Sequence, residues 1–244
     1  MLKYKFLGVN NSLQEVKSGN TSLLIGSDGT HLLIDTSVNI AEAVDFDVDA
    51  VLFTHEHIDH LYALPSLLHQ MWLMKRKRQL NIYCHIGMNE IVNNLIDIFG
   101  IRGKKGIFPI AINNDDELKI GDIFVEAVKS NHTEYSRSYV FRYAGKKLVY
   151  TSDTRPFAYA PQSFMDADVL IHEAGGTDLE REKLIDGGHS TAGDAATLAK
   201  KTNAKKLLLC HLPVGDNVKL HIKKTAIKIF KDTNLADVNS WVCL

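Results

Sequence analysis

The chain has 244 residues, of which 45% are hydrophobic and 23% are charged, and its formal net charge at pH 7 is −1. A chain of this size can bury a substantial core, and it contains no linker rich in Pro, Ser or Gly, so we expect one domain over residues 1–244. The near-zero charge argues against a long nucleic acid as partner, because binding one depends on neutralising many phosphates.

The strands and helices of the first half can be predicted from the spacing of apolar residues. Residues 2–8 alternate, and the turn Ser27-Asp28-Gly29 between two apolar segments predicts a hairpin. The predicted strands are 2–8, 21–25, 31–35, 50–54 and 80–84, and the predicted helices are 61–75 and 89–99, the latter ended by Gly100.

The second half continues with short strands and two further helices. The expected strands are 108–112, 117–120, 123–129, 138–143, 147–151, 169–172 and 206–210, and the expected helices are 192–201 and 218–230. Many strands with helices between them and near the end favour an α/β fold in which helices cover two packed sheets.

The sequence shows no sign of a membrane or secreted protein. No apolar run approaches the roughly 20 residues of a membrane helix, and the N-terminus lacks the apolar segment of a signal peptide. The cysteines Cys84, Cys210 and Cys243 form neither a disulfide framework nor a zinc-binding CxxC motif. We therefore expect a cytoplasmic protein with free thiols that does not associate with membranes.

Polar residues gather at the ends of the predicted strands, where loops usually carry functional sites. The densest group is Thr54-His55-Glu56-His57-Ile58-Asp59-His60. On an extended segment His55 and His57 point the same way, whereas Asp59 and His60 face a second position as the chain turns into a helix. One zinc ion takes about four ligands and cannot easily use all of these, so the segment predicts two adjacent metal ions.

Two metal ions require more ligands, and three residues have a suitable context. His132 and His211 follow predicted strands, and Asp153 stands in Thr151-Ser152-Asp153-Thr154. A single histidine after a strand is usually an ordinary loop residue. The ordered set, HxHxDH followed by His, Asp and His, is much less expected by chance and predicts two Zn²⁺ ions, with Mn²⁺ as an alternative.

The order of these segments resembles the metallo-β-lactamase superfamily over most of the chain, which implies a four-layer αββα sandwich. Asp35 would then support the metal loop without binding metal. Asp153, where a common class of lactamases has cysteine, disfavours lactam hydrolysis, and His57, where flavo-diiron proteins have a carboxylate, disfavours redox chemistry. The resemblance divides the ligands as follows: His55, His57 and His132 for one zinc, Asp59, His60 and His211 for the other, and Asp153 as the bridge.

Three segments resemble the ribonuclease Z branch of the superfamily: Ser152-Asp153-Thr154-Arg155-Pro156, His172-Glu173-Ala174 and Gly188-His189-Ser190-Thr191. A histidine outside the metal ligands can protonate a leaving alkoxide, and a carboxylate can hold it in the right tautomer. We predict His189 as the general acid, Glu173 as its orienting partner, and Asp59 as a ligand that doubles as a base. A Ser/Thr helix N-cap in the last segment is compatible with this role.

Two features depart from ribonuclease Z. The resemblance would place a tRNA-clamping arm between the His132 and Asp153 motifs, but Asp153 follows His132 by only 21 positions, which a hairpin fills. The N-terminal segment Gly8-Val9-Asn10-Asn11 lacks that family's run of glycines. Both features argue against tRNA 3′ processing and leave phosphodiester hydrolysis as the expected chemistry.

Short members of this branch without the arm resemble cyclic-nucleotide phosphodiesterases of the phage and bacterial anti-Pycsar type. We therefore expect a small cyclic-nucleotide substrate, hydrolysis of 3′,5′-cyclic mononucleotides to 5′-monophosphates, and a role in blunting cyclic-nucleotide defence signalling; the resemblance implies a homodimer. The alternatives are a ribonuclease Z-like endoribonuclease or other phosphodiesterase, a thioester or lactone hydrolase, and a non-catalytic, metal-stabilised nucleotide-binding protein.

Two further features allow two interpretations each. The basic run at residues 74–78 could bind phosphate, although cations at a helix C-terminus also complement the helix dipole. The aromatic residues near the metal motifs could stack on a base or pack in the core, and they are Tyr135, Tyr139, Phe157 and Tyr159.

Overall fold

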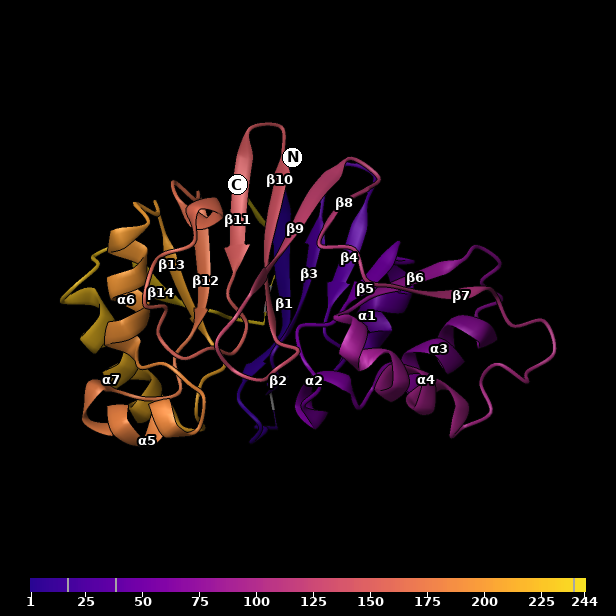
Figure 1. Ribbon diagram of the computed structural model, residues 1–244, viewed down its shortest axis with the longest axis horizontal. Helices are drawn as coiled ribbons and strands as arrows, with labels where there is room; N and C mark the ends of the chain where they lie inside the picture. Colours follow the sequence, from indigo (N-terminus) through magenta and orange to yellow (C-terminus); the bar gives the residue numbers. More distant parts are fainter. Residues whose placement is uncertain (17, 38, 239) are drawn as a thin grey trace.

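The computed structural model describes residues 1–16, 18–37, 39–238 and 240–244. Two β-sheets pack face to face, and helices cover the outer face of each sheet (Figure 1). This four-layer αββα arrangement confirms the predicted fold class.

The first sheet has the strand order β15-β1-β3-β4-β5-β6-β7, and β2 pairs with β1. Strands β1, β3 and β4 pair antiparallel, whereas β4 to β7 run parallel. Its strands are β1 (Lys3–Asn10), β2 (Gly19–Asn20), β3 (Ser22–Gly26), β4 (His31–Ile34), β5 (Ala50–Leu52), β6 (Leu80–Tyr83), β7 (Ile110–Asn113) and β15 (Val242–Cys243).

The second sheet has the strand order β14-β13-β12-β11-β10-β9-β8. Strands β8 to β11 pair antiparallel and β11 to β14 run parallel. Its strands are β8 (Glu117–Ile120), β9 (Ile123–Lys129), β10 (Arg137–Tyr143), β11 (Lys146–Tyr150), β12 (Val169–Glu173), β13 (Leu207–Cys210) and β14 (Thr233–Leu235).

The helices divide between the two outer layers, as Figure 1 shows. Buried side chains of α1, α3 and α4 pack on the first sheet, and those of α6 and α7 pack on the second. The helices are α1 (Ile40–Asp45), α2 (Ile58–Leu61), α3 (Leu64–Leu73), α4 (Asn89–Asp97), α5 (Arg181–Asp186), α6 (Ala192–Lys201) and α7 (Asp216–Ile227). In the described ranges, no helix is long and apolar enough to cross a membrane.

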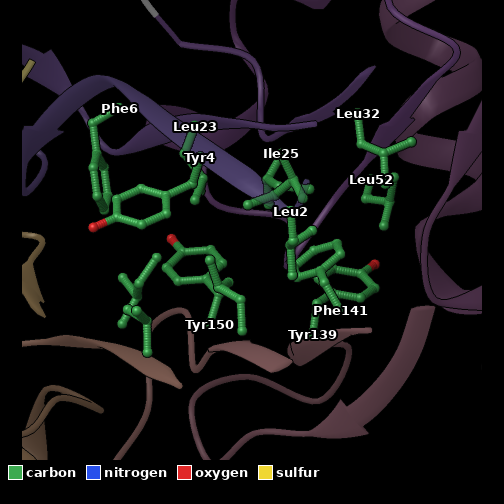
Figure 2. Close-up of a cluster of buried hydrophobic side chains, with 14 of the residues drawn as sticks. Leu2, Tyr4, Phe6, Leu23, Ile25, Leu32, Leu52, Tyr139, Phe141 and Tyr150 are labelled. Carbon is green, nitrogen blue, oxygen red and sulfur yellow. The ribbon is translucent and has the colours of Figure 1, made fainter. Parts of the chain in front are cut away.

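The strands are apolar on both faces because each sheet is covered on both sides. In β3, Leu23 and Ile25 enter the core between the sheets, whereas Leu24 packs under the helices. Figure 2 shows the inner face of the first sheet, including Tyr4 and Ile25, opposite Tyr139, Phe141 and Tyr150 of the second sheet. Burying one such large side chain contributes about 1.5–3 kcal/mol, so this core holds the two sheets together.

The helix predicted at 61–75 is α3, which begins at Leu64, and the short helix α2 that precedes it was not predicted. Pro65 lies in the first turn of α3. Proline lacks a backbone N–H and clashes with the carbonyl four residues earlier, so it is accepted at a helix start and not in the interior. As a result α2 is a separate turn, which carries Asp59 and His60.

The topology brings the ends of distant strands to one edge of the second sheet. Strands β11, β12 and β13 are parallel, and β9 runs in the same direction because both β9 and β11 are antiparallel to β10. The segments that follow these strands begin with residues 130, 151, 174 and 211, so the predicted polar residues converge there.

Candidate metal centre

The HxHxDH segment begins three residues after the end of β5 and ends inside α2. His57 is the N-cap residue of α2 and has extended backbone angles, so the chain changes direction between His57 and Asp59. The side chains of His55 and His60 are fully buried, whereas His57 is exposed. The segment therefore presents its ligands on two sides, as the sequence predicts.

Three ring nitrogens meet at the first position. Nδ1 of His57 lies 3.2 Å from Nε2 of His55 and 2.9 Å from Nε2 of His132. In a tetrahedral zinc site with Zn–N bonds of 2.0–2.1 Å, two ligand nitrogens are separated by about 3.3 Å. The three histidines are thus spaced as ligands of one ion.

A second group lies beside the first. Nε2 of His60 and Nε2 of His211 are 3.6 Å and 3.7 Å from the same carboxylate oxygen, Oδ2 of Asp59. These three residues are buried and form one of the structure's candidate metal-binding groups.

Asp153 lies between the two groups. Its Oδ2 is 3.2 Å from Nε2 of His211 and 3.6 Å from Nε2 of His60, and it is 3.8 Å and 3.9 Å from Nε2 of His55 and His132. One carboxylate oxygen therefore faces histidines of both groups, which is the position that a bridging ligand takes.

Several buried polar atoms of the donor set have no partner within the described part of the protein. Nε2 of His60, Oδ1 of Asp153 and both ring nitrogens of His211 are buried and have no hydrogen-bond partner among the described residues. Buried polar groups in native proteins are nearly always paired. Unpaired imidazole and carboxylate atoms that converge in this way fit a pair of divalent cations.

The histidine tautomers are set by partners that accept a hydrogen bond from Nδ1. Nδ1 of His60 lies 2.7 Å from Oδ2 of Asp35, and Nδ1 of His132 lies 2.8 Å from the carbonyl oxygen of Gly188. The Thr54 hydroxyl donates to Asp35 and therefore accepts from Nδ1 of His55. In each of these histidines Nδ1 carries the hydrogen, so the lone pair on Nε2 is directed into the site.

Metal binding requires neutral imidazoles and ionised carboxylates, and the pKa values of three ligands are shifted in that direction. His60 is the exception, because burial lowers its pKa but the charges of Asp35 and Asp153 outweigh burial and raise that pKa well above its usual value. Burial holds the pKa of His55 well below its usual value and lowers the pKa of His132 to about 4. Burial opposes the ionisation of Asp153, but the charges of His211 and His60 outweigh it and hold the pKa of that carboxyl well below its usual value.

His189 and Glu173 form a hydrogen-bonded pair beside the metal ligands. Nδ1 of His189 lies 3.1 Å from Oε2 and 3.2 Å from Oε1 of Glu173, and it is 4.0 Å from Oδ2 of Asp153. Glu173 is fully buried, whereas the His189 side chain is 25% exposed. Burial lowers the pKa of His189, but the hydrogen bond and charge of Glu173 outweigh it and raise that pKa to about 9.

The structure places every residue that the sequence singled out for the metal centre in one cluster. Their roles as ligands, acid and base stay predictions, whereas their convergence is a property of the fold. The sequence names Gly188 only as part of the segment that carries His189, and the contact of its backbone carbonyl with His132 was not predicted. Gly188 has a positive φ of 91°, a backbone conformation that favours glycine. The presence of glycine at this position is therefore the only sign in the sequence of the local conformation.

The other two features receive structural explanations. Arg76 is buried and pairs with Asp47, and Arg78 pairs with Asp47 and Asp49, so these cations brace the fold at the end of α3. Tyr139 is buried and its hydroxyl donates to the carbonyl of Phe53, so base stacking by Tyr139 is wrong.

The remaining aromatic residues differ in their surroundings. Tyr135 stacks on His85 and packs against the core of the first sheet, and Phe157 packs edge-on against Phe164. Tyr159 is 90% exposed, whereas Tyr135 and Phe157 are partly buried.

Comparison with known proteins connects this geometry to a family. Residues 30–212 match a family model described as the beta-lactamase superfamily domain. The chain is 24% identical to a ribonuclease Z of Archaeoglobus fulgidus in an alignment that covers 97% of this chain and 96% of the relative. That alignment spans 295 positions, which exceeds the length of this chain, so the relative contains insertions that are missing here.

Two solved structures show the same fold. The metallo-beta-lactamase fold protein YhfI from Bacillus subtilis superposes with a TM-score of 0.85 at 22% identity, covering 99% of this chain and 98% of that one. Human tRNase Z, short form (ELAC1), superposes with a TM-score of 0.81 at 20% identity, with the same two coverages.

Proposed function

Because the chain belongs to the β-lactamase superfamily, in its ribonuclease Z-like branch, and is thus a metal-dependent hydrolase, we propose that its substrate is a phosphodiester. The observation that carries this proposal is the pair of His189 and Glu173 next to the carboxylate of Asp153. A phosphodiester of ribose has an alkoxide leaving group, which needs a proton, and a positioned imidazolium can supply one.

The reaction that we propose adds water across the bond between phosphorus and the 3′ oxygen of a ribose. The new bond joins the water oxygen to phosphorus, and the bond from phosphorus to the 3′ oxygen breaks. His189 donates its proton to that leaving oxygen. The products are a free 3′-hydroxyl group and a 5′-phosphate.

The chain's own residues hold the reacting groups in place. Glu173 accepts from Nδ1 of His189, so the Nε2–H of the imidazolium is the proton available for transfer. Asp59 is a candidate acceptor for the proton that water loses, because its carboxyl group is ionised: burial raises its pKa, but the hydrogen bond from His211 and the charges of His60 and His211 outweigh burial and lower it. The two ligand groups would each hold one divalent cation, and such a pair would supply an activated water and positive charge for the phosphoryl oxygens.

The relatives and the length of one connection favour different substrates. The curated relatives are ribonuclease Z enzymes, which supports an RNA phosphodiester as the first candidate. The second candidate is a 3′,5′-cyclic mononucleotide. It is favoured by the short connection between His132 and Asp153, which holds β10 and β11 and leaves no room for an arm that could clamp a long RNA. The same bond to a 3′ oxygen is broken in both cases.

The experiment that separates these candidates uses the purified protein loaded with Zn²⁺ or Mn²⁺. Its substrates are a precursor tRNA with a 3′ trailer, the four 3′,5′-cyclic mononucleotides and bis-p-nitrophenyl phosphate, and products are identified by chromatography and mass. The Asp153→Ala variant serves as the control for contaminating nucleases.

Cleavage of the precursor tRNA would support the ribonuclease Z-like function, whereas opening of cyclic nucleotides to 5′-monophosphates alone would support the second candidate. Hydrolysis of neither natural substrate, with activity on thioesters or lactones, would overturn the phosphodiesterase proposal. Nucleotide binding without any turnover would instead favour a non-catalytic binding protein.

A further inference from the structure

The guanidinium of Arg155, which follows Asp153 by two residues, is held by backbone carbonyls beside the metal centre. This guanidinium has no carboxylate within ion-pair distance among the described residues. Instead it donates to four backbone carbonyls: Nε to Ile185 at 2.8 Å, Nη2 to Asp186 at 3.3 Å, and Nη1 to Asn131 at 3.2 Å and His132 at 3.3 Å.

These carbonyls belong to two separate segments. Ile185 and Asp186 are the last two residues of α5, and Gly187 and Gly188 connect that helix to His189. Asn131 and His132 lie in the loop after β9, which carries a predicted metal ligand. The last carbonyls of a helix lack partners within the helix and carry partial negative charge, so a cation at this point is stabilising. Arg155 therefore ties the segment of His189 to the segment of His132.

The neighbouring residue holds the other half of the acid pair. The backbone N–H of Thr154 donates to Oε1 of Glu173 at 2.5 Å, and its carbonyl accepts from the hydroxyl of Ser190 at 2.6 Å. Thr154 and Arg155 follow directly after Asp153. A two-residue segment thus fixes Glu173, the flanks of His189 and the bridging carboxylate relative to one another.

We infer that Arg155 is a positioning residue for His189, which sets the distance between that imidazole and the oxygen that leaves the phosphorus. This inference rests on the proposed phosphodiesterase function. The side-chain N–H groups of Arg155 already donate to backbone carbonyls. Arg155 therefore contributes by placing His189 and not by contacting the substrate. A displacement of about 1 Å can lower the rate of a positioned reaction by about 10²-fold.

The chemistry of the leaving group offers a direct test. p-Nitrophenolate is a weak base that leaves without protonation, whereas a ribose 3′ oxygen requires a proton. Arg155→Ala should therefore lower kcat by about 10²-fold on the ribonucleotide substrate that the wild type cleaves, with little change on bis-p-nitrophenyl phosphate. Arg155→Lys should be intermediate, because a lysine cannot reproduce the planar fork that reaches both segments.

Three controls make the result specific. Metal content must stay at the wild-type value in Arg155→Ala. Arg142 lies on β10 and pairs with Glu126 of β9, so Arg142→Ala also removes a guanidinium but should leave both activities unchanged. Because Arg155 acts through His189, the double variant Arg155→Ala/His189→Ala should be no slower than His189→Ala alone.

An equal loss on both substrates, or losses that add in the double variant, would overturn the inference. A wild type inactive on every phosphodiester would overturn the proposed function instead. NMR then decides the role of Arg155, because the Nδ1–H resonance of His189 reports its hydrogen bond to Glu173 without turnover. Loss or a marked shift of that resonance in Arg155→Ala supports the positioning role, and an unchanged resonance refutes it.

Discussion

Asp35 governs the metal centre although it is not among the predicted ligands. Its carboxylate accepts from the Thr54 N–H at 2.9 Å, the Thr54 hydroxyl at 2.8 Å and Nδ1 of His60 at 2.7 Å. In Asp35→Asn, an amide with one acceptor oxygen would face three donors. We expect zinc to bind about 10–100-fold more weakly, because His60 loses the partner that fixes its tautomer.

Competition with a chromophoric chelator measures this change. Asp28→Asn is a suitable control, since the Asp28 side chain is 76% exposed and pairs only at the surface with the N-terminus and Tyr143. Unaltered zinc affinity in Asp35→Asn would show that the orientation of His60 does not depend on Asp35.

His189 differs from the predicted metal ligands in its hydrogen-bond partner, because its Nδ1 hydrogen is directed to the carboxylate of Glu173. His189→Ala should keep its metal and its stability but lose about 10²–10⁴-fold in turnover, the range for a lost general acid. Steady-state kinetics and metal analysis check both halves of this prediction, with His221→Ala on the exposed face of α7 as the control. A fully active variant would disprove the acid assignment, and a variant that loses metal would make His189 a ligand.

The pH dependence of turnover follows from the same pair. A general acid must be protonated, so activity should fall as the pH rises through the pKa of His189. The hydrogen bond and charge of Glu173 outweigh burial and raise that pKa to about 9, and bound cations act in the opposite direction. Glu173→Gln removes the charge, so the alkaline limb of kcat should move to lower pH. An alkaline limb at the same pH in both proteins would separate Glu173 from the acid.

At the scale of elements, the connection between α5 and α6 is shaped around His132. Gly188 has φ of 91°, and a Cβ added there would lie 2.6 Å from Nδ1 of His132. Gly188→Ala should therefore lower the free energy of unfolding by more than about 1 kcal/mol and weaken metal binding, because the strain and the clash act together. Urea denaturation and zinc titration test this, with Gly29→Ala, whose added Cβ meets nothing within 4 Å, as the control. Equal stability of the two variants would contradict it.

The sequence predicts the elements that are long or strongly apolar and fails for short ones. Strand β13 is a continuous apolar segment and β12 begins with one, and both are buried throughout, so the sequence predicts both strands. The short helices α1 and α5 and the strands β14 and β15 were not predicted, since three to six residues, or two in β15, carry too little periodicity. The break between α2 and α3 depends on Pro65, which is tolerated at the start of a helix and not in its interior.

The candidate site was predictable to the extent that side chains define it. Each predicted ligand follows a strand or begins a helix, and that pattern can be read along the chain. The partners that fix these ligands are often backbone groups, such as the carbonyl of Gly188 that accepts from His132. A carbonyl is present at every residue and leaves no mark in a sequence, so only the fold identifies the one that matters.

At the scale of the whole molecule, the metal centre joins the two sheets at one end of the core between them. His55, His57, Asp59 and His60 lie on connections of the first sheet, whereas His132, Asp153 and His211 follow strands of the second. Bound metal should therefore stabilise the packing of the two layers as well as the loops that carry the ligands.

Chelation with EDTA should accordingly lower the Tm of the entire domain, and added Zn²⁺ should restore it. A ligand that binds only the folded state adds about 4 kcal/mol at a free concentration one thousand times its Kd. Circular dichroism follows both sheets, while fluorescence of Trp72 and Trp241 follows the first-sheet side, where both pack. Coincident shifts of both signals, absent in Asp153→Ala, are expected because the cations link both layers. A chelator that removes the metal without moving Tm would mean that binding orders only local loops.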